Sequence, residues 1–159
     1  MTTERLVLRS WTPAEASAVR DGARQPHWAA DFPAEGDQVI AGLLTEHPAW
    51  LDGYHRLLVE RGSGLVVGSI GLFWPPADGV VEIGYGVVAS RRGRGYATEA
   101  TRALTAFAFT APGVRAVRAE VELSNPASVR VLEKAGFERR GVDAEQGTAQ
   151  YGVTSPAGR

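Results

Sequence analysis

The segment 87–100 constrains the fold more than any other, because it reads as a strand, a glycine-rich turn and a helix start in direct succession. Its turn places Gly93 and Gly95 among arginines. A helix N-terminus presents unpaired N–H groups and a partial positive charge, and glycine lets an anion approach the backbone closely. The segment is therefore a candidate phosphate site. A plain turn with solvated arginines is the alternative interpretation of the same residues.

Two other phosphate-binding motifs fail at this turn. A P-loop needs a lysine followed by serine or threonine, and the chain's only lysine is Lys134, in a different predicted helix. A dinucleotide fingerprint needs a third glycine where Thr98 stands, within an opening strand–helix–strand unit. The preceding residues 54–88 instead alternate as strands with short turns, which predicts an antiparallel meander.

Hydrophobic periodicity and turn residues predict an α/β fold, with a mixed and mostly antiparallel twisted sheet flanked by about four helices. Thr12 and Glu15 have the spacing of a capping box at the start of the first helix, and residues 39–44 recur at helical spacing. The other expected elements are strands at 5–9, 54–60, 65–74 and 80–88, a turn at 75–79, a helix at 96–109, a strand at 114–123, a helix at 125–136, and strands at 137–142 and 149–154. We expect a single domain over residues 1–154 and a flexible tail at 155–159.

The composition excludes several classes of function. A formal net charge of −1 gives no general electrostatic reason to bind nucleic acid or an anionic membrane. There is no cysteine, which removes disulfides, thiolate metal sites and a cysteine nucleophile together. His27, His47 and His55 show no metal-ligand spacing, and no apolar run is long enough to span a bilayer. We expect a cytoplasmic protein without a metal, and a homodimer is left open.

The residues Arg92-Gly93-Arg94-Gly95-Tyr96-Ala97 resemble the acetyl-coenzyme A loop of the GNAT N-acetyltransferases, whose pattern is Gln/Arg-x-x-Gly-x-Gly/Ala. The opening segment 3–9, the strand Glu82-Ile83-Gly84-Tyr85 and the segment 97–100 resemble the RimJ/RimL-like subgroup (ribosomal-protein-alanine acetyltransferase-like) of that family. The resemblance covers almost the whole chain. It implies a GNAT fold and transfer of an acetyl group from acetyl-CoA to a primary amine, either a protein N-terminal α-amine or a small-molecule amine.

The same resemblance implies most of the expected cofactor contacts. The backbone of Val87, Val88 and Ala89 is expected to pair with the pantetheine arm, and Asn125 belongs to a second coenzyme A motif. The diphosphate is expected against Arg92, Gly93, Arg94, Gly95, Tyr96 and Ala97. From the residues alone, Asn125 is an N-cap followed by proline at the first helical position. Independently, Gly84 and Gly86 interrupt an apolar strand, which predicts a bulge or a close backbone approach there.

Glu82 is the candidate general base, acting directly or through water. By strand alternation it shares a face with Gly84 and Gly86, in the strand that enters the loop. The same pattern fits a carboxylate that is paired with an arginine or faces solvent. Many GNAT enzymes have a tyrosine general acid where Leu132 stands, and the RimJ/RimL-like pattern implies Ser128 as the partner of the departing thiolate. With no cysteine to carry the acetyl group, we expect direct transfer while both substrates are bound.

The resemblance also implies where the acceptor amine binds. Family members line the acceptor pocket with the loop between the first two helices, which holds Trp28 and Phe32 here, and with the last strands, which hold Tyr151. Tyr85 is a further candidate acceptor contact. The identity of the amine and the preferred acyl length are left open. A non-catalytic acetyl-CoA sensor is a second class of function, which would keep the phosphate loop and lack the acid and the base.

Overall fold

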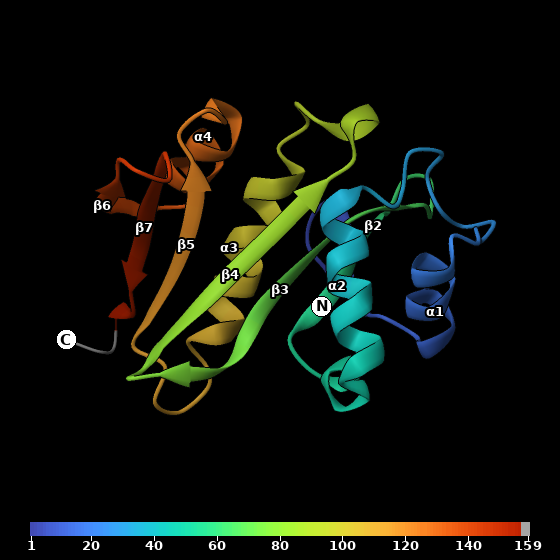
Figure 1. The fold of residues 1–159 in the computed structure, drawn as a ribbon, viewed down its shortest axis with the longest axis horizontal. Helices are drawn as coiled ribbons and strands as arrows, with labels where there is room; N and C mark the ends of the chain where they lie inside the picture. The colour runs from blue at the N-terminus through green and yellow to red at the C-terminus, as the bar shows by residue number, and fades with distance from the viewer. Residues whose placement is uncertain (157–159) are drawn as a thin grey trace. The chain divides into compact units, whose positions relative to one another are not determined.

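A computed structural model describes residues 1–156 of the chain; residues 157–159, at the end of the predicted tail, lie outside the described part. Its elements are β1 (Leu6–Ser10), α1 (Pro13–Asp21), α2 (Glu35–Glu46), η1 (Pro48–Asp52), β2 (His55–Glu60), β3 (Val66–Ala77), β4 (Val80–Val87), η2 (Ala89–Arg91), α3 (Tyr96–Ala108), β5 (Ala116–Glu122), α4 (Pro126–Lys134), β6 (Glu138–Asp143) and β7 (Thr148–Thr154). Helices α1 to α4 are α-helices, and η1 and η2 are short 3₁₀ helices. Figure 1 labels these helices and strands along the chain.

The strands form a seven-stranded sheet in the order β1-β2-β3-β4-β5-β7-β6. β4 and β5 are parallel, whereas β1 with β2, β2 with β3, β5 with β7 and β6 with β7 are antiparallel. This mixed, mostly antiparallel sheet with four α-helices confirms the predicted fold class. By its internal contacts the chain divides into two compact units, Met1–Gly71 with Tyr85–Ala100, and Leu72–Gly84 with Thr101–Arg159.

The first unit contains the predicted capping box at the start of α1. The Thr12 hydroxyl accepts a hydrogen bond from the Glu15 N–H at 3.1 Å, and the Glu15 carboxylate accepts one from the Thr12 N–H at 3.0 Å. These reciprocal bonds satisfy backbone donors that a helix start leaves unpaired. α1 and α2 pack against each other and lie side by side in Figure 1. The predicted start of the first helix is therefore confirmed.

The loop between α1 and α2 is anchored by aromatic packing within the first unit. The Phe32 ring lies 5.2 Å from the Trp28 ring and 6.4 Å from the Trp11 ring, measured between centroids. The Val66 N–H donates to the His27 carbonyl at 2.9 Å, which ties the loop to the start of β3. Because buried rings and a strand-like bridge fix it at both points, this loop is an ordered part of the fold.

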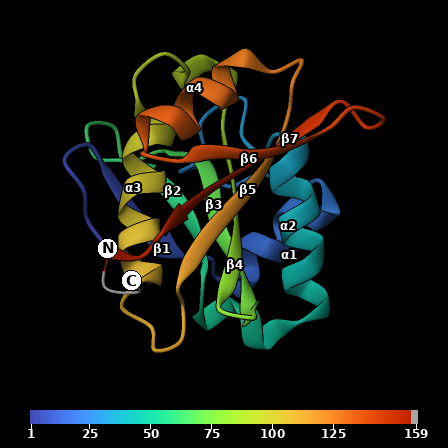
Figure 2. The ribbon, with the colours of Figure 1, turned by 90° about the vertical axis from the view of Figure 1, so that its left-hand side faces the viewer.

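The second unit contains the hairpin between β3 and β4 and the three strands β5, β7 and β6, which run side by side in Figure 2. The five-residue turn predicted at 75–79 is wrong, because β3 continues to Ala77. Only Asp78 and Gly79 form the turn, with φ angles of 52° and 78°. Two consecutive positive φ angles are typical of a type I′ hairpin, and Asp-Gly is a preferred sequence for it.

Ser155, the first residue of the predicted tail, packs against the rest of its unit. Ser155 is buried, and its N–H donates to the Arg115 carbonyl at 2.8 Å. The flexible tail predicted from residue 155 is therefore wrong at Ser155, since a buried and hydrogen-bonded residue belongs to the folded unit.

Candidate cofactor loop and candidate catalytic residues

The glycine-rich turn connects η2 to α3, and both of its glycines have left-handed backbones. Gly93 has a φ angle of 79° and Gly95 one of 78°, a region that side chains disfavour. α3 begins at Tyr96, and its first backbone bond closes from the Glu99 N–H to the Gly95 carbonyl at 3.0 Å. The N–H groups before it have no partner within the helix. The turn therefore joins two left-handed glycines to a helix start with unpaired N–H groups, and anion binding at this turn remains a prediction.

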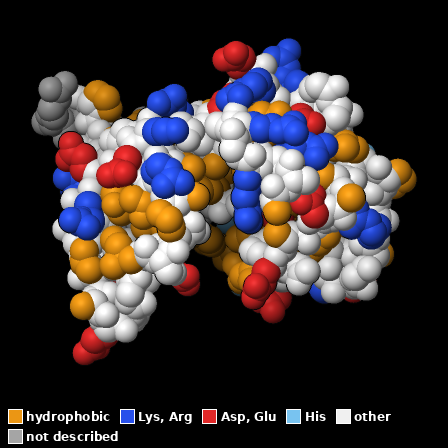
Figure 3. Space-filling model, turned by 90° about the horizontal axis from the view of Figure 1, so that it is seen from above, with side chains coloured by type: hydrophobic (Ala, Val, Ile, Leu, Met, Phe, Trp, Pro, Cys, Tyr) orange, Lys and Arg blue, Asp and Glu red, His pale blue; other side chains and the backbone are white. Residues whose placement is uncertain are grey.

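Arginine side chains surround this backbone at different exposures. The Arg92 Nε donates to the Val87 carbonyl at 3.2 Å, which folds that side chain back onto the end of β4. The Arg94 side chain is 51% exposed, so its guanidinium is accessible to a ligand at the helix start. The loop lies at the top of Figure 1, and Figure 3 looks down on that face, where Lys and Arg side chains are exposed. These charges favour an anion such as a diphosphate.

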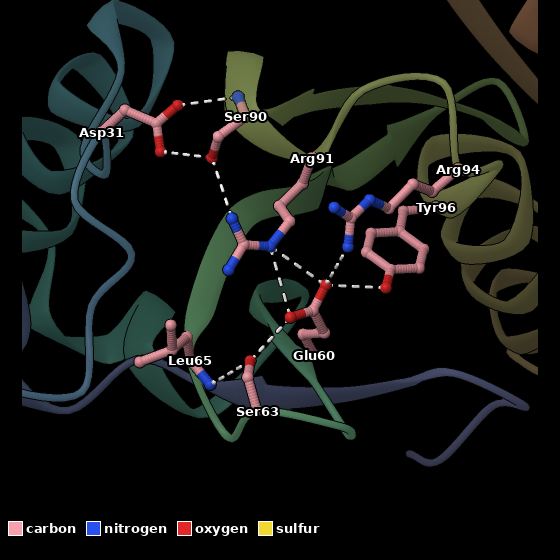
Figure 4. Close-up of polar contacts among 8 residues, drawn as sticks. All are labelled: Asp31, Glu60, Ser63, Leu65, Ser90, Arg91, Arg94 and Tyr96. Atoms are coloured by element: carbon pink, nitrogen blue, oxygen red, sulfur yellow. Dashed lines mark hydrogen bonds and ion pairs between the residues drawn. The ribbon is translucent and has the colours of Figure 1, made fainter.

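A single buried carboxylate, Glu60 at the end of β2, connects the side chains beneath the loop (Figure 4). It accepts hydrogen bonds from the Tyr96 hydroxyl and the Ser63 hydroxyl, each at 2.7 Å. It also pairs with Arg91 at 3.1 Å and with Arg94 at 3.3 Å. One carboxylate thus fixes the positions of side chains from the turn after β2, from η2, from the loop and from α3.

Glu60 is held in its ionised form by these partners. Burial acts to raise the pKa of the carboxyl, and the hydrogen bonds from Ser63, Tyr96 and Arg91 outweigh burial and lower it. The pKa of the Tyr96 hydroxyl is raised, first by burial and then by its hydrogen bond to Glu60. Glu60 could not be singled out from the sequence, because a glutamate at the end of a strand gives no signal that it lies under a distant loop.

The predicted close backbone approach next to the loop is present, but a different glycine permits it. A Cβ at Gly68 in β3 would lie 2.2 Å from the Gly86 carbonyl oxygen, whereas a Cβ at Gly86 would meet nothing within 4 Å. At Gly84 a Cβ would meet the Phe73 ring at 3.3 Å. The close backbone approach thus involves the Gly86 carbonyl, as predicted, but the glycine whose missing side chain permits it is Gly68 on the neighbouring strand.

The predicted pantetheine segment follows directly on this contact. The Val88 N–H donates to the Val67 carbonyl at 2.9 Å, and the Val88 side chain is buried. The Val87 carbonyl accepts the Arg92 bond described above, and Ala89 begins η2. Pairing of Val87, Val88 and Ala89 with a pantetheine arm remains a prediction.

Glu82, the candidate base, lies in the second unit where β4 runs parallel to β5. The pairs of this ladder join Val80–Glu82 to Ala116–Arg118, with Glu82 opposite Arg118. The Arg118 Nη2 lies 3.1 Å from the Glu82 carboxylate, which is 40% exposed. The arginine pairing that the sequence left open is thus present. A base role requires the amine to displace or share this partner, and it remains a prediction.

The helix α4 has the predicted cap in the second unit. The Asn125 side-chain oxygen accepts a hydrogen bond from the Ser128 N–H at 3.2 Å, and Pro126 stands at the first helical position. Ser128 therefore lies in the first turn, half-buried. Leu132 is fully buried, so its side chain contributes packing. Cofactor contact by Asn125 and thiolate contact by Ser128 remain predictions.

The predicted acceptor contacts are mostly buried. Trp28 is 4% exposed, Phe32 1% and Tyr151 4%. Their observed contribution is packing, in the loop described above for Trp28 and Phe32 and in β7 for Tyr151. Tyr85, in β4, is half-buried. Contact of these four residues with an acceptor remains a prediction.

Comparison with known proteins agrees with this geometry. Residues 5–138 match the model of the Acetyltransferase (GNAT) domain. The chain therefore belongs to the GNAT family of N-acetyltransferases. Enzymes of this family use acetyl-CoA, and the loop described above fits such a ligand because it combines a helix start, two left-handed glycines and an exposed arginine.

Individual relatives are similar over parts of the chain. YjdG of Bacillus subtilis, an uncharacterized N-acetyltransferase, is 33% identical over 82 residues, which are 51% of this chain and 49% of YjdG. The chain thus spans about half the length of this relative. Aminoglycoside N(6')-acetyltransferase type 1 of Klebsiella pneumoniae is 41% identical over 66 residues, which are 41% of this chain and 33% of that protein.

A solved acetyltransferase structure from Agrobacterium tumefaciens is similar over nearly the whole length. It is 25% identical, with a TM-score of 0.71, and the match covers 98% of this chain and 94% of that one. No helix in the described part of the chain is long and apolar enough to cross a membrane. Within residues 1–156, no group of three or more His, Cys, Asp or Glu side chains is placed to hold a metal ion.

Proposed function

We propose that the protein transfers the acetyl group of acetyl-CoA to a primary amine, with both substrates bound at once. The observation that carries this proposal is the start of α3, where Gly93 and Gly95 have left-handed backbones and Arg94 is exposed. Such a helix start binds diphosphates through free N–H groups and the helix dipole. Membership of the GNAT family supports acetyl transfer as the reaction. The opening residues 3–9 support a RimJ/RimL-like enzyme within it.

At the acyl carbon, the proposed reaction forms a C–N bond and breaks a C–S bond. The amine nitrogen attacks the thioester carbonyl carbon, the new C–N bond forms, and the C–S bond then breaks. Glu82 takes the proton that the amine loses, directly or through a water molecule. The Ser128 hydroxyl donates a hydrogen bond to the departing sulfur, or a proton that solvent restores to the serine oxygen in the same step. The absence of cysteine supports direct attack, because no thiol is available to carry the acetyl group.

The acceptor proposed is a primary amine on a small molecule or at a peptide N-terminus. Similarity to an aminoglycoside N(6')-acetyltransferase supports a small-molecule amine as the first class to test. The RimJ/RimL-like opening supports a peptide α-amine as the second. An α-amine has a reference pKa of about 8 and a lysine-like amine about 10.4. Acetylation of a lysine-like amine therefore depends more on a general base near neutral pH.

A non-catalytic acetyl-CoA sensor is the alternative function. Two observations favour it: Arg118 already pairs with Glu82 at 3.1 Å, and buried Leu132 occupies the position of the usual tyrosine acid. The sensor would bind acetyl-CoA through the same loop and release no thiol.

A thiol-release assay with acetyl-CoA separates these functions. Kanamycin, spermidine and short peptides with free N-termini serve as acceptors, and the matched control is the Glu82→Gln variant with the same acceptors. We expect thiol release above the acceptor-free rate with at least one class, and a marked loss in the variant. Coenzyme A binding without thiol release across all classes would contradict transfer and support the sensor.

A further inference from the structure

The N-terminal segment 3–5 contacts the first turn of α3, within the first unit. The Thr3 hydroxyl donates to Glu99 Oε2 at 2.5 Å, and the Arg5 N–H donates to the same oxygen at 2.8 Å. The Arg5 Nε donates to the other oxygen, Oε1, at 2.9 Å. Both carboxylate oxygens of Glu99 are therefore bound by residues that lie more than ninety positions earlier in the chain.

The Arg5 side chain also lies directly against the loop. Its Nη1 donates to the Arg94 carbonyl, and its Nη2 lies 3.0 Å from the position that a Gly95 Cβ would take. The guanidinium carbon stands 5.2 Å from the centre of the Tyr96 ring, a cation–π distance. Arg5 thus contacts three consecutive residues of the candidate diphosphate loop and the carboxylate that follows them.

The position of Glu99 makes these contacts important for anion binding. Glu99 is an acidic residue in the first turn of α3. A negative charge there interacts favourably with the helix dipole, but it repels a second anion that binds at the same helix start. Burial acts to raise the pKa of Glu99, and the bonds from Thr3 and Arg5 outweigh it and lower the pKa. The carboxylate is therefore ionised, and its side chain is only 14% exposed, so water screens it incompletely.

We propose that Arg5, aided by Thr3, is a positioning residue of the cofactor site. It neutralises Glu99, so that this charge does not oppose the diphosphate, and it fixes the Arg94–Gly95 peptide in the orientation that aims the helix start at the ligand. Residues 3–5 thereby belong to the cofactor site, although they lie far from it in the sequence. This inference rests on the proposed function, because it assumes that coenzyme A binds at the loop.

Calorimetric titration of free coenzyme A tests the inference without knowledge of the acceptor. Arg5→Met keeps the side-chain stem and removes the charge, and we expect the dissociation constant to rise about 5-fold to 30-fold, the scale of charge effects at helix termini. Glu99→Gln alone removes the opposing charge and should bind coenzyme A at least as tightly as the wild type. The double variant Arg5→Met/Glu99→Gln should regain most of the lost affinity.

A matched control and a second variant keep the test decisive. Arg20→Met removes an arginine of similar exposure, 52% against 44% for Arg5, which pairs with Asp21 at the end of α1, and it should leave coenzyme A affinity unchanged. Arg5→Lys retains the charge without the planar fork, so its affinity should lie between those of the wild type and Arg5→Met. It replaces Arg5→Met in the comparison if the methionine variant does not fold.

The outcomes separate the inference from the proposed function. Wild-type protein that does not bind coenzyme A would contradict the proposed function itself. Wild-type binding with unchanged affinity in both Arg5 variants would overturn only the inference. A double variant that binds no better than Arg5→Met would also overturn it, since a purely structural role for Arg5 gains nothing from removing the Glu99 charge. Recovery in the double variant supports the inference.

Discussion

The Asp31 carboxylate accepts two hydrogen bonds from Ser90, one from the backbone N–H and one from the hydroxyl, each at 2.8 Å (Figure 4). The backbone bond from Ser90 is the main cause of a lowered Asp31 pKa. Asp31 belongs to the loop between α1 and α2, and Ser90 belongs to η2 before the glycines. This pair ties the loop predicted to face the acceptor to the loop predicted to hold the cofactor.

Replacing Asp31 tests how far that tie orders the cofactor loop. Asp31→Asn removes the charge from both bonds, and we expect coenzyme A to bind several-fold more weakly, with a loss of unfolding free energy of about 0.5–1.5 kcal/mol. Denaturant unfolding and calorimetry measure the two effects. Asp21→Asn, an exposed aspartate in α1 paired with Arg20, is the control and should change neither quantity appreciably. Equal coenzyme A affinity in the two variants would show that the hydrogen bonds between Asp31 and Ser90 do not affect cofactor binding.

The lowered pKa of the Glu15 carboxyl predicts that the fold loses stability in acid. Burial acts to raise its pKa, but hydrogen bonds from Arg9, His27 and the Thr12 N–H lower it from 4.5 to about 2. A depressed carboxyl pKa contributes stability that is complete above the ordinary value and is lost as the pH falls toward the folded value. The wild type should therefore lose about 2–3 kcal/mol of unfolding free energy from this group between about pH 5 and about pH 2.

Glu15→Gln isolates this contribution from those of other carboxylates. The variant should be less stable than the wild type near neutral pH, and the difference should shrink steadily as the pH falls below about 4.5. Urea titrations at a series of pH values measure it. A difference in unfolding free energy that stays constant with pH would mean that Glu15 contributes by packing and not by its charge.

Gly68 and Gly86 lie next to each other on neighbouring strands, but only at Gly68 should replacement by alanine lower the stability of the fold appreciably. Gly68→Ala places a Cβ 2.2 Å from the Gly86 carbonyl oxygen, a backbone atom that moves only if β4 moves. We expect a loss of about 1–3 kcal/mol, typical of overpacking, together with weaker coenzyme A binding. Gly86→Ala meets open space and should change unfolding free energy by less than about 0.5 kcal/mol. Thermal unfolding of the two variants side by side checks this, and equal stabilities would contradict the close approach.

Catalytic predictions require an acceptor found by the thiol-release assay. Glu82→Gln should lower turnover by about 10²-fold or more near neutral pH and recover as the amine deprotonates at higher pH. A wild-type pH profile in the Glu82 variant would leave Glu82 as the structural partner of Arg118.

Ser128→Ala should cost about 10-fold to 10²-fold in turnover with little change in acetyl-CoA binding, because a thiol is already a fair leaving group. Lost cofactor affinity with a normal saturated rate in the Ser128 variant would make Ser128 a cofactor contact.

The sequence predicted those parts of the fold that depend on local chemistry. The capping box at Thr12 and the Asn125 cap are both consequences of short-range backbone requirements, so their residue types indicate them. Pro75 and Pro76 are typical turn residues, so the sequence predicts a turn that begins too early, at residue 75. They lie instead in β3, ahead of a two-residue turn.

Long-range contacts in the site could not be predicted in the same way. Glu60 lies beneath Arg91 and Arg94, thirty or more positions away, and no spacing in the chain encodes that meeting. The opening segment 3–9 and the segment 97–100 were recognised only as marks of a subgroup. The structure adds that Arg5 and Glu99 from these two segments bind each other. The glycines that interrupt β4 indicate a close backbone approach, but they cannot identify Gly68, because the pattern of one strand does not show which residue lies opposite on the next.

Calorimetric titration of coenzyme A into the wild type, Gly95→Glu and Gly113→Glu tests the central claim most directly. Both glycines have left-handed φ angles, 78° at Gly95 and 86° at Gly113, so the two variants carry similar backbone strain and the same added charge. Only Gly95 lies at the helix start proposed to bind the diphosphate. The account predicts that Gly95→Glu nearly abolishes binding while Gly113→Glu binds like the wild type. Equal affinity in all three proteins would contradict it.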